Sequence, residues 1–279
     1  MSALLRCGRF RLAPSRPLIM GIVNVTPDSF SDGGRDAKLS IAHAFRLIEE
    51  GADIIDLGAE STRPGAAVVP PEVEMGRLMP VMRALRDAPV PISIDTMKPA
   101  VMRAMIGGGA SFINDINALM ADEALLAVAD SDVGVCLMHM RGDPATMQQS
   151  PDYDDVVGEV RAYLEARVAA AEAAGIARDR ICIDPGFGFG KTVEHNVRLL
   201  RDLGKFAATG LPVMFGASRK STLGALTGRP VAGRVHASVA AALLAAQRGA
   251  SILRVHDVAP TRDALAIWLA IRDETTTRH

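Results

Sequence analysis

The sequence of 279 residues predicts an α/β protein built as a single (β/α)8 barrel, the TIM-barrel architecture. Short apolar runs with the length of buried strands alternate along the chain with longer segments of helical periodicity. Eight such runs recur at intervals of about 33 residues, the length of a strand with its crossover helix. No Pro-, Gly- or Ser-rich linker divides the chain into two domains. A doubly wound parallel sheet is the alternative fold, because strands are difficult to count from a sequence.

The predicted strands are apolar, and their order along the chain is 18–25, 53–57, 90–94, 111–113, 133–138, 181–183, 212–215 and 251–255. The segments between them have helical periodicity. In the first, Ile41, Ala44, Phe45 and Ile48 fall on one helical face, and Gly51 follows as a stop signal. Residues 18–279 are therefore expected to form the barrel. Residues 1–17 precede the first strand, and we expect this N-terminal extension to cover the bottom of the barrel.

The composition excludes several classes of protein. Lys and Arg number 31 against 32 Asp and Glu, a formal net charge of −1 that favours neither nucleic acid nor an anionic membrane as a partner. Hydrophobic residues make up 49%, which excludes global disorder, and no apolar run is long enough to span a bilayer. The first sixteen residues lack the apolar stretch of a signal peptide. Three cysteines without a C-x-x-C motif are typical of a reducing compartment, so we expect a cytoplasmic protein.

Polar residues stand at or just after the end of nearly every predicted strand. In a parallel barrel the carboxyl ends of the strands meet at one face, where such barrels carry their chemistry. One Asp or Asn after a strand is usually a turn former or a helix cap, but eight that converge on one mouth indicate a site. The residues are Asn24, Asp56 (with Glu60), Asp95, Asn114, His139, Asp184, Ser218 and His256.

A glycine-rich segment, GFGFGKT at 186–192, resembles a nucleotide-binding loop only superficially. The phosphate-loop pattern requires glycine where Pro185 stands, and glycines at alternate positions lack the spacing of the dinucleotide fingerprint. ATP and NAD are therefore not expected. The segment is interpreted as a loop between a strand and a helix, in which Phe187 and Phe189 either plug the core or form the apolar wall of a pocket for a flat ligand.

The histidines do not form a metal-binding pattern. The six are scattered, with no H-x-x-x-H motif or Cys/His cluster, so zinc is not expected. A hard cation that arrives with a phosphate substrate needs only one or two protein oxygens, and Asn24 could supply one. His139 is left open as either a structural or a functional residue.

Basic residues near the strand ends indicate an anion pocket. Arg63 follows the second strand, Lys220 the seventh, and Arg254 and His256 lie at the eighth. The ends of the last two strands are the usual anion site of this fold. We interpret the neighbouring Arg219 as a solvated surface charge.

Seven segments, in order from the first strand to the eighth, together resemble the dihydropteroate synthase family. They are MGIVNVTPDSFSDGG at 20–34, GAESTRPG at 58–65, SIDT at 93–96, NDI at 114–116, DPGFGFGK at 184–191, SRKS at 218–221 and RVHD at 254–257. Each segment alone is a weak signal, whereas the ordered set is specific. The chain departs from the family at none of these motif positions.

The resemblance implies a transferase of folate biosynthesis, the target of sulfonamides. Such an enzyme joins 6-hydroxymethyl-7,8-dihydropterin diphosphate to para-aminobenzoate and releases pyrophosphate and 7,8-dihydropteroate. It also implies a (β/α)8 barrel that uses Mg²⁺, is a homodimer, and has small molecules rather than nucleic acid or membrane as partners.

The resemblance also implies roles for individual residues. The pterin would be bound by Asp95, Asn114, Ile116, Met138, Asp184, Gly216, Lys220 and Arg254. The diphosphate would be bound by Asn24, Thr62, Arg63, Arg254 and His256. The para-aminobenzoate would contact Thr62, Pro64, Phe189, Ser218, Lys220 and Ser221. The catalytic set would be Arg63, Lys220, Arg254 and His256, and Asn24 would contact the magnesium ion.

Two other functions remain as alternatives. A pterin-dependent methyltransferase on the same barrel would share Asp95, Asn114 and Asp184 but needs no diphosphate site, so the loops 26–34 and 61–65 and the SRKS turn favour the synthase. A non-catalytic pterin- or phosphate-binding subunit would be expected to lose Asn24, Arg63 or Lys220, and all three are present.

Overall fold

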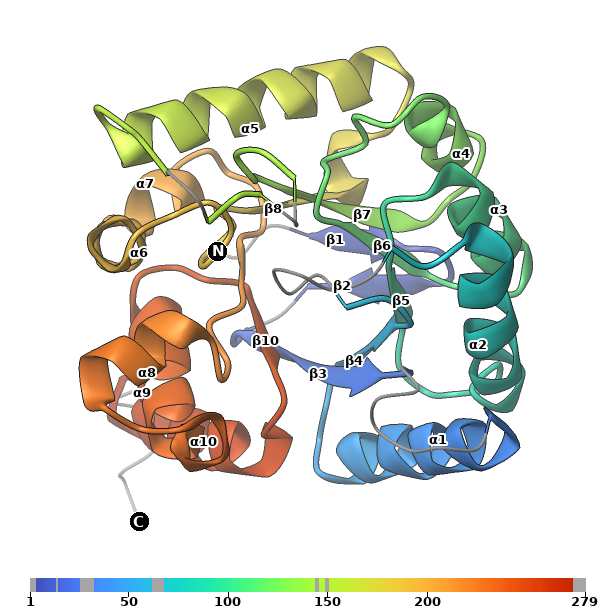
Figure 1. The fold of residues 1–279 in the computed structure, drawn as a ribbon, viewed down its shortest axis with the longest axis horizontal. Helices are drawn as coiled ribbons and strands as arrows, with labels where there is room; N and C mark the ends of the chain where they lie inside the picture. Colours follow the sequence, from blue (N-terminus) through green and yellow to red (C-terminus); the bar gives the residue numbers. More distant parts are fainter. Residues whose placement is uncertain are drawn as a thin grey trace.

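The computed structural model describes residues 4–13, 15–25, 33–61, 68–143, 146–148 and 151–272, with the backbone alone for 33–36. Eight parallel strands form one sheet in the order β8-β7-β6-β5-β4-β3-β10-β9. A parallel bridge from Ile183 to Val213 joins the two ends of this order. The helices lie around the ring of strands (Figure 1). The predicted (β/α)8 barrel is therefore confirmed, and the doubly wound sheet was the wrong alternative.

Each of the eight predicted strands forms, with small differences at its ends. The barrel strands are β3 (Leu18–Asn24), β4 (Ile54–Gly58), β5 (Ile92–Asp95), β6 (Phe112–Asp115), β7 (Gly134–Met138), β8 (Ile181–Asp184), β9 (Met214–Phe215) and β10 (Ile252–Val255). The seventh of these, β9, is two residues shorter than predicted. Pro212 has no N–H to donate to a ladder, and Val213 pairs with Ile183 as an isolated bridge outside the strand.

The helices follow the strands in the expected alternation. They are α1 (Gly33–Glu49), α2 (Pro71–Ala84), α3 (Pro99–Gly107), α4 (Ala124–Ala129), α5 (Val156–Ala173), α6 (Val193–Arg201), α7 (Gly204–Ala207), α8 (Ser221–Thr227), α9 (Val235–Gln247) and α10 (Val258–Arg272). Short 3-10 turns occur at Arg178–Arg180 and Val231–Gly233. Helix α8 is an additional short helix between β9 and α9, at the position where this fold often binds phosphate.

The alternation of side chains along the strands creates two interior layers. Because successive residues of a strand point to opposite faces, every second residue enters the barrel. The lower interior layer is apolar and includes Met20, Ile54, Phe112, Met214 and Ile252, all completely buried. Two residues further along most of these strands, the inward positions become polar. The apolar layer therefore serves as the floor of the site.

A short antiparallel hairpin precedes the barrel. Its strands are β1 (Leu5–Cys7) and β2 (Phe10–Leu12), and the Gly8 N–H at the turn donates to the Asp132 carbonyl. Leu5 and Cys7 belong to the lower interior cluster, so the hairpin packs against the amino ends of the barrel strands.

The cysteines are all buried and free, and they contact the lower layer. Cys136 and Cys182 are paired in register on β7 and β8, and burial raises the pKa of the Cys7 thiol to about 12. Burial also raises the pKa of the Cys136 thiol, so Cys7 and Cys136 are protonated at neutral pH. Among the described helices, none is long and apolar enough to cross a membrane.

Candidate active site

Polar side chains from five strands converge above the apolar floor. Side chains alternate between the two faces of a strand, so a residue two positions beyond an inward residue also points into the barrel. Four residues lie two positions beyond a member of the lower layer: Asp56, Asn114, Asp184 and Arg254. Asp95 points inward as well, because it lies beside Asn114 on the neighbouring strand. Asp95 and Asn114 are register partners on β5 and β6. Asp56, Asn114 and Asp184 are buried. The predicted pterin-binding side chains on β5, β6, β8 and β10 are thus brought to one end of the barrel.

Arg254 joins two carboxylates across this layer. Its Nε donates to Asp56 Oδ2 at 2.7 Å, and its terminal NH2 donates to Asp95 Oδ2 at 2.6 Å. Burial raises the pKa of Asp95 to about 7, although the Arg254 charge opposes the shift. Asp56 and Asp95 in turn hold the pKa of Arg254 above its usual value against the cost of burial. The guanidinium is therefore fixed and charged before any anion arrives.

Asp56 is the one member of this layer to which the sequence analysis gave no role. Its Oδ1 accepts from Ser93 Oγ at 2.6 Å, and its Oδ2 accepts from Asn114 Nδ2 at 3.3 Å as well as from Arg254. Asp56 therefore orients both Asn114 and Arg254. The sequence analysis counted Asp56 among the polar residues at the strand ends. The signal that could have assigned its role is its inward position, two residues after the apolar Ile54 in a strand that is buried on both faces.

Asp56→Asn is expected to destabilise the protein by about 1–3 kcal/mol and to weaken pterin diphosphate binding, because the amide puts a donor next to donors and removes the charge beside Arg254. Ser93→Ala is the matched control, since it removes one hydrogen bond to Asp56 and keeps the carboxylate. Urea denaturation and calorimetric titration measure the two effects. An Asp56→Asn variant that binds pterin diphosphate with wild-type affinity would contradict the orienting role.

Asp184 ends β8 and accepts a hydrogen bond from the backbone of the glycine-rich loop. The Gly186 N–H donates to Asp184 Oδ1 at 2.6 Å, which leaves the second carboxylate oxygen for another donor. Gly186 has φ +71°, and a Cβ there would lie 1.9 Å from the His139 carbonyl oxygen, so only glycine fits. Burial raises the pKa of Asp184, and the charge of Lys220 opposes that shift.

Lys220 reaches across the mouth to the same loop. Its Nζ donates to the Phe187 carbonyl at 2.6 Å and lies 4.5 Å from the centre of the Phe189 ring. Burial lowers the pKa of Lys220 to about 8, although Asp184 opposes the shift. The two aromatic residues of the loop differ in their surroundings. Phe187 is buried against Phe215 in the core, and Phe189 is half-buried below the Lys220 ammonium.

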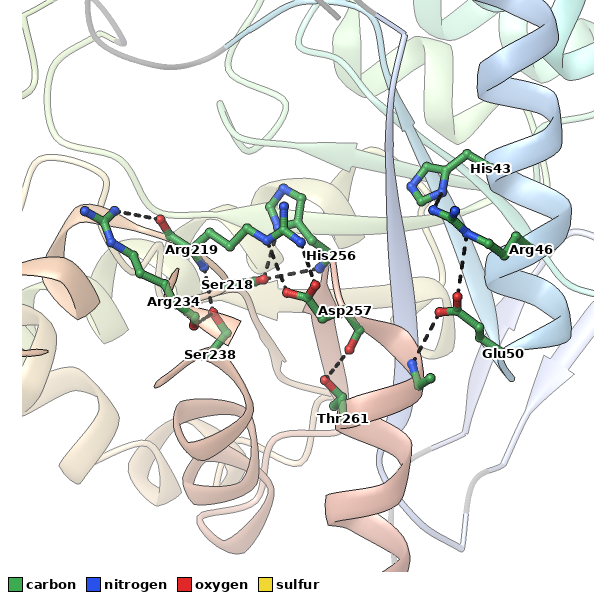
Figure 2. A network of polar contacts seen from close by, with 11 residues as sticks. His43, Arg46, Glu50, Ser218, Arg219, Arg234, Ser238, His256, Asp257 and Thr261 are labelled. Carbon is green, nitrogen blue, oxygen red and sulfur yellow. Dashed lines mark hydrogen bonds and ion pairs between the residues drawn. The ribbon is translucent and has the colours of Figure 1, made fainter. Parts of the chain in front are cut away.

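The turn before α8 is held by a network of polar contacts (Figure 2). Arg219 has a left-handed backbone, with φ +60°, and its guanidinium donates twice to Asp257, at 3.1 and 2.5 Å. The Arg219 N–H donates to Ser238 Oγ, and Arg234 donates to the Arg219 carbonyl at 3.0 Å. The interpretation of Arg219 as a solvated surface charge was therefore wrong, because the bidentate ion pair fixes an otherwise unfavourable backbone conformation.

Three further predicted residues lie in or beside this turn. His256 Nδ1 lies 3.0 Å from Ser218 Oγ, which also accepts from the His256 backbone N–H at 3.2 Å (Figure 2). Ser221 is the first residue of α8 and is exposed. The contacts between His256 and Ser218 thus join the segment after β10 to the segment after β9, near Lys220.

Four of the remaining predicted residues lie in the described part of the chain, and three do not. Ile116 and Met138 are buried at the ends of β6 and β7, and a Cβ on Gly216 would lie 3.6 Å from Arg254 Cβ. Asn24 is exposed at the end of β3, beside Gly58 of β4. The three predicted residues of the segment that follows β4 lie outside the described residues: Thr62, Arg63 and Pro64.

His139 is a structural residue. It is buried, its Nδ1 lies 3.0 Å from Lys191 Nζ, and its ring packs edge-on against Tyr163. Burial lowers the pKa of His139 to about 3, so the ring is neutral at physiological pH. His139 is therefore part of the support beneath the glycine-rich loop.

Known proteins resemble this chain over nearly its whole length. The family model for pterin-binding enzymes matches residues 20–256. Dihydropteroate synthase of Neisseria meningitidis serogroup B is 53% identical over 275 residues, which cover 95% of this chain and 96% of that protein. The Xanthomonas albilineans dihydropteroate synthase structure with 4-aminobenzoic acid has a TM-score of 0.92 at 53% identity, with 98% and 99% of the two chains covered. A structure of the enzyme from the same organism in complex with 7,8-dihydropteroate has a TM-score of 0.88 at 48% identity, with the same coverage.

A closed (β/α)8 barrel with converging carboxylates, an amide and cations at one mouth, together with the family match, defines a pterin-binding enzyme. Among pterin-binding enzymes, the chain shares about half of its residues with dihydropteroate synthases. The chain belongs to the dihydropteroate synthase family.

Proposed function

We propose that the mouth of this barrel condenses 6-hydroxymethyl-7,8-dihydropterin diphosphate with para-aminobenzoate to give 7,8-dihydropteroate and pyrophosphate. The observation that carries the proposal is the joint placement of Asp184, Lys220 and Phe189. The buried Asp184 carboxylate suits the N–H donors of a flat heterocycle. The Lys220 cation above the Phe189 ring suits an aromatic carboxylate such as a benzoate beside it. Related structures contain 4-aminobenzoic acid and 7,8-dihydropteroate.

The pterin would bind within the polar layer. Its amino-pyrimidinone edge presents adjacent N–H donors, and the Asp184 carboxylate would accept from that edge. Asn114 both donates and accepts, so it suits a mixed edge of the heterocycle. Lys220 would donate to the ring carbonyl and ring nitrogen, and Asp95 would accept from the far side. Met138 and Arg254 would pack against the faces of the ring, beside Ile116 and Gly216.

The chemistry requires little from a general acid or base. The C–O bond of the methylene carbon breaks and its electrons leave with pyrophosphate, while the pterin delocalises the positive charge that develops. The lone pair of the aniline nitrogen forms the new C–N bond, and that nitrogen then loses a proton to solvent. Arg63, Arg254 and His256 would stabilise the charge on the leaving group, with Thr62 beside them. Because the aniline is neutral at pH 7, no nucleophile–base pair is needed.

The para-aminobenzoate would lie between the glycine-rich loop and the start of α8. The half-buried ring of Phe189 would pack on the benzene ring. Lys220, Ser218 and Ser221 are the polar groups on that side, and Ser221 is exposed where the carboxylate would arrive. Pro64, outside the described residues, would close the pocket in this proposal.

The residues present fit a magnesium ion that is bound mainly by the substrate. Among the described residues, no group of three or more His, Cys, Asp or Glu is placed to hold a metal ion. Mg²⁺ commonly takes one or two protein oxygens and completes its shell with phosphate oxygens and water. The exposed Asn24 amide at the end of β3 would supply such an oxygen. When bound, the ion would neutralise charge on the diphosphate.

The affinity for pterin diphosphate is expected to fall above pH 8. Burial lowers the pKa of Lys220 to about 8, so the free enzyme loses this charge at a pH where an exposed lysine keeps it. Binding of the charged form then requires proton uptake, and the affinity declines by up to roughly tenfold per pH unit until the pKa of Lys220 in the complex is reached. Calorimetry from pH 7 to pH 9.5 measures the decline. Lys220→Met should bind weakly without it, and a flat wild-type profile would contradict the assignment.

Pyrophosphate release from the two substrates tests the proposed function. The enzyme with both substrates and Mg²⁺ should release one pyrophosphate per dihydropteroate formed, and omission of para-aminobenzoate should abolish product. A pterin-dependent methyltransferase would instead consume a methyl-folate without pyrophosphate. A non-catalytic subunit would bind pterin diphosphate and release nothing. Either of these results would overturn the proposal.

The assembly and location of the protein are part of the same proposal. Leu244 of α9 and Ile267 and Ile271 of α10 expose large apolar side chains, which supports a homodimer through this side of the barrel. Three free, buried cysteines support a reducing cytoplasm. Sedimentation equilibrium of the wild type and of Ile271→Glu would measure the dimer.

A further inference from the structure

Every backbone carbonyl of the Gly186–Gly190 loop accepts a hydrogen bond from a side chain. Loops at a protein surface usually leave many such groups to water. Here the side-chain donors are Lys191 to Gly186 (3.0 Å), Lys220 to Phe187 (2.6 Å), Gln148 to Gly188 (2.6 Å), Lys191 to Phe189 (2.9 Å) and Tyr153 to Gly190 (2.9 Å). The loop is therefore held from several elements at once.

Lys191 is the central donor of this arrangement and is almost completely buried, with 3% of its surface exposed. Besides the two loop carbonyls, its Nζ contacts His139 Nδ1 at 3.0 Å and the His139 carbonyl at 3.4 Å. These partners are three carbonyl oxygens and a neutral imidazole. A buried ammonium group with only neutral partners is costly, because the charge is removed from water without a counter-charge. Burial accordingly lowers the pKa of Lys191 to about 7. Its hydrogen bonds bind the loop after β8 to the loop after β7.

Asn196 is a second residue that holds this loop. This residue of α6 is buried, and its Oδ1 accepts from the Gly188 N–H at 2.7 Å. Its Nδ2 donates to Thr222 Oγ1 at 2.9 Å, in the helix that begins directly after Lys220. Asn196 thus sets the distance between the glycine-rich loop and α8.

The loop in turn determines where Lys220 lies. The Phe187 carbonyl fixes its Nζ, and the Phe189 ring lies beneath it. Gly188, at φ +84°, approaches so closely that a Cβ there would lie 3.1 Å from Lys220 Cδ. A displacement of the loop would therefore move both the ammonium and the aromatic wall.

We propose that Lys191 and Asn196 are positioning residues for the para-aminobenzoate half of the site, acting through the Gly186–Gly190 loop on Phe189 and Lys220. The inference rests on the proposed function. The pterin half depends on the loop less. Lys220 would serve the pterin as well, but its other partners Asp184, Asn114 and Asp95 belong to the strands of the barrel. Loss of either positioning residue should thus separate the two substrates in their response.

The test uses the full chain with Lys191→Met, Asn196→Leu and the double variant. We expect each single variant to raise KM for para-aminobenzoate by roughly tenfold or more, since small displacements of a positioning group have effects of this size. The Kd for pterin diphosphate should rise by a clearly smaller factor, because Lys220 is the one proposed side-chain partner of the pterin that this loop positions. The double variant should be no worse than the more severe single variant, because both residues act on one loop.

Arg180→Met is the matched control. Arg180 is likewise a buried cation bound to carbonyls, those of Val133 and Val128, but it lies at the other end of β8. It should lower Tm without changing KM for either substrate. If Lys191→Met does not fold, Asn196→Leu decides the question.

An unchanged KM for para-aminobenzoate in folded variants, including a loss of Tm alone as expected for the control, would overturn the positioning role while the wild-type reaction stands. Absence of pyrophosphate release by the wild type would instead overturn the proposed function. In that case, direct calorimetry of para-aminobenzoate in the presence of pyrophosphate and Mg²⁺ still compares wild type and variants.

Discussion

Asp184→Asn is expected to abolish measurable binding of pterin diphosphate while the barrel remains folded. The wild-type carboxylate is buried and already accepts the Gly186 N–H on one oxygen, so the other oxygen must accept from the pterin edge. An amide offers a donor in one of these places. The resulting unpaired donors cost roughly 1–3 kcal/mol or more, which is about tenfold to over a hundredfold in affinity. Calorimetric titration with pterin diphosphate measures the loss.

Asp115→Asn is the control for this experiment. Asp115 is also a buried carboxylate at a strand end, and it accepts the backbone N–H groups of Asn117 and Leu119, but it lies on the outward parity of β6. Burial raises the pKa of Asp115 to about 6, as it raises that of Asp184. We expect the control to lower stability and leave pterin affinity intact. Near-normal affinity in Asp184→Asn would refute its role.

Arg254→Met is expected to have the largest effect on stability. The substitution leaves Asp56 and Asp95 without their cation in a buried layer, and breaking such a pair from one side costs about 3–5 kcal/mol. The free energy of unfolding in urea at pH 7 measures this cost. The variant should also lose the diphosphate site, because the guanidinium would be its fixed cation.

The pH dependence identifies the cause of that loss. Burial already raises the pKa of Asp95 to about 7, and removal of Arg254 removes the main opposing charge. The folded variant therefore binds protons that the unfolded chain releases, so its stability should increase as the pH falls from 7 toward the ordinary Asp value. Adding Asp95→Asn should restore part of the stability at pH 7. A variant whose deficit does not change with pH would show that packing, not charge, is responsible.

The barrel and most of its mouth could be predicted because two periodicities act together. A strand period of two and a unit of about 33 residues predict which polar residues point inward and at which end they meet. Asp95, Asn114, Asp184 and Arg254 followed from this pattern and from the motifs. Asp56 lies in the same inward register, but its role depends on contacts with residues far away in the sequence.

Other features depended on tertiary contacts that no local pattern specifies. The structural role of Arg219 arises from Asp257, which is 38 residues away, and from Arg234 at the start of α9. Phe187 and Phe189 have the same type and the same spacing from glycine, yet only packing against Phe215 decides which enters the core. Lys191 belongs to a motif that matched the family, but its hydrogen bonds to two neighbouring loops become evident only in the fold.

The most direct test of the account is a crystal structure of this protein with 7,8-dihydropteroate. The account predicts the pterin inside the mouth, with its amino-pyrimidinone edge within hydrogen-bond distance of Asp184 and Asn114. The benzoate should extend past Phe189 toward Ser221 at the start of α8. A product bound with its pterin outside the polar layer, or with the benzoate on the side of Asn24, would contradict the account.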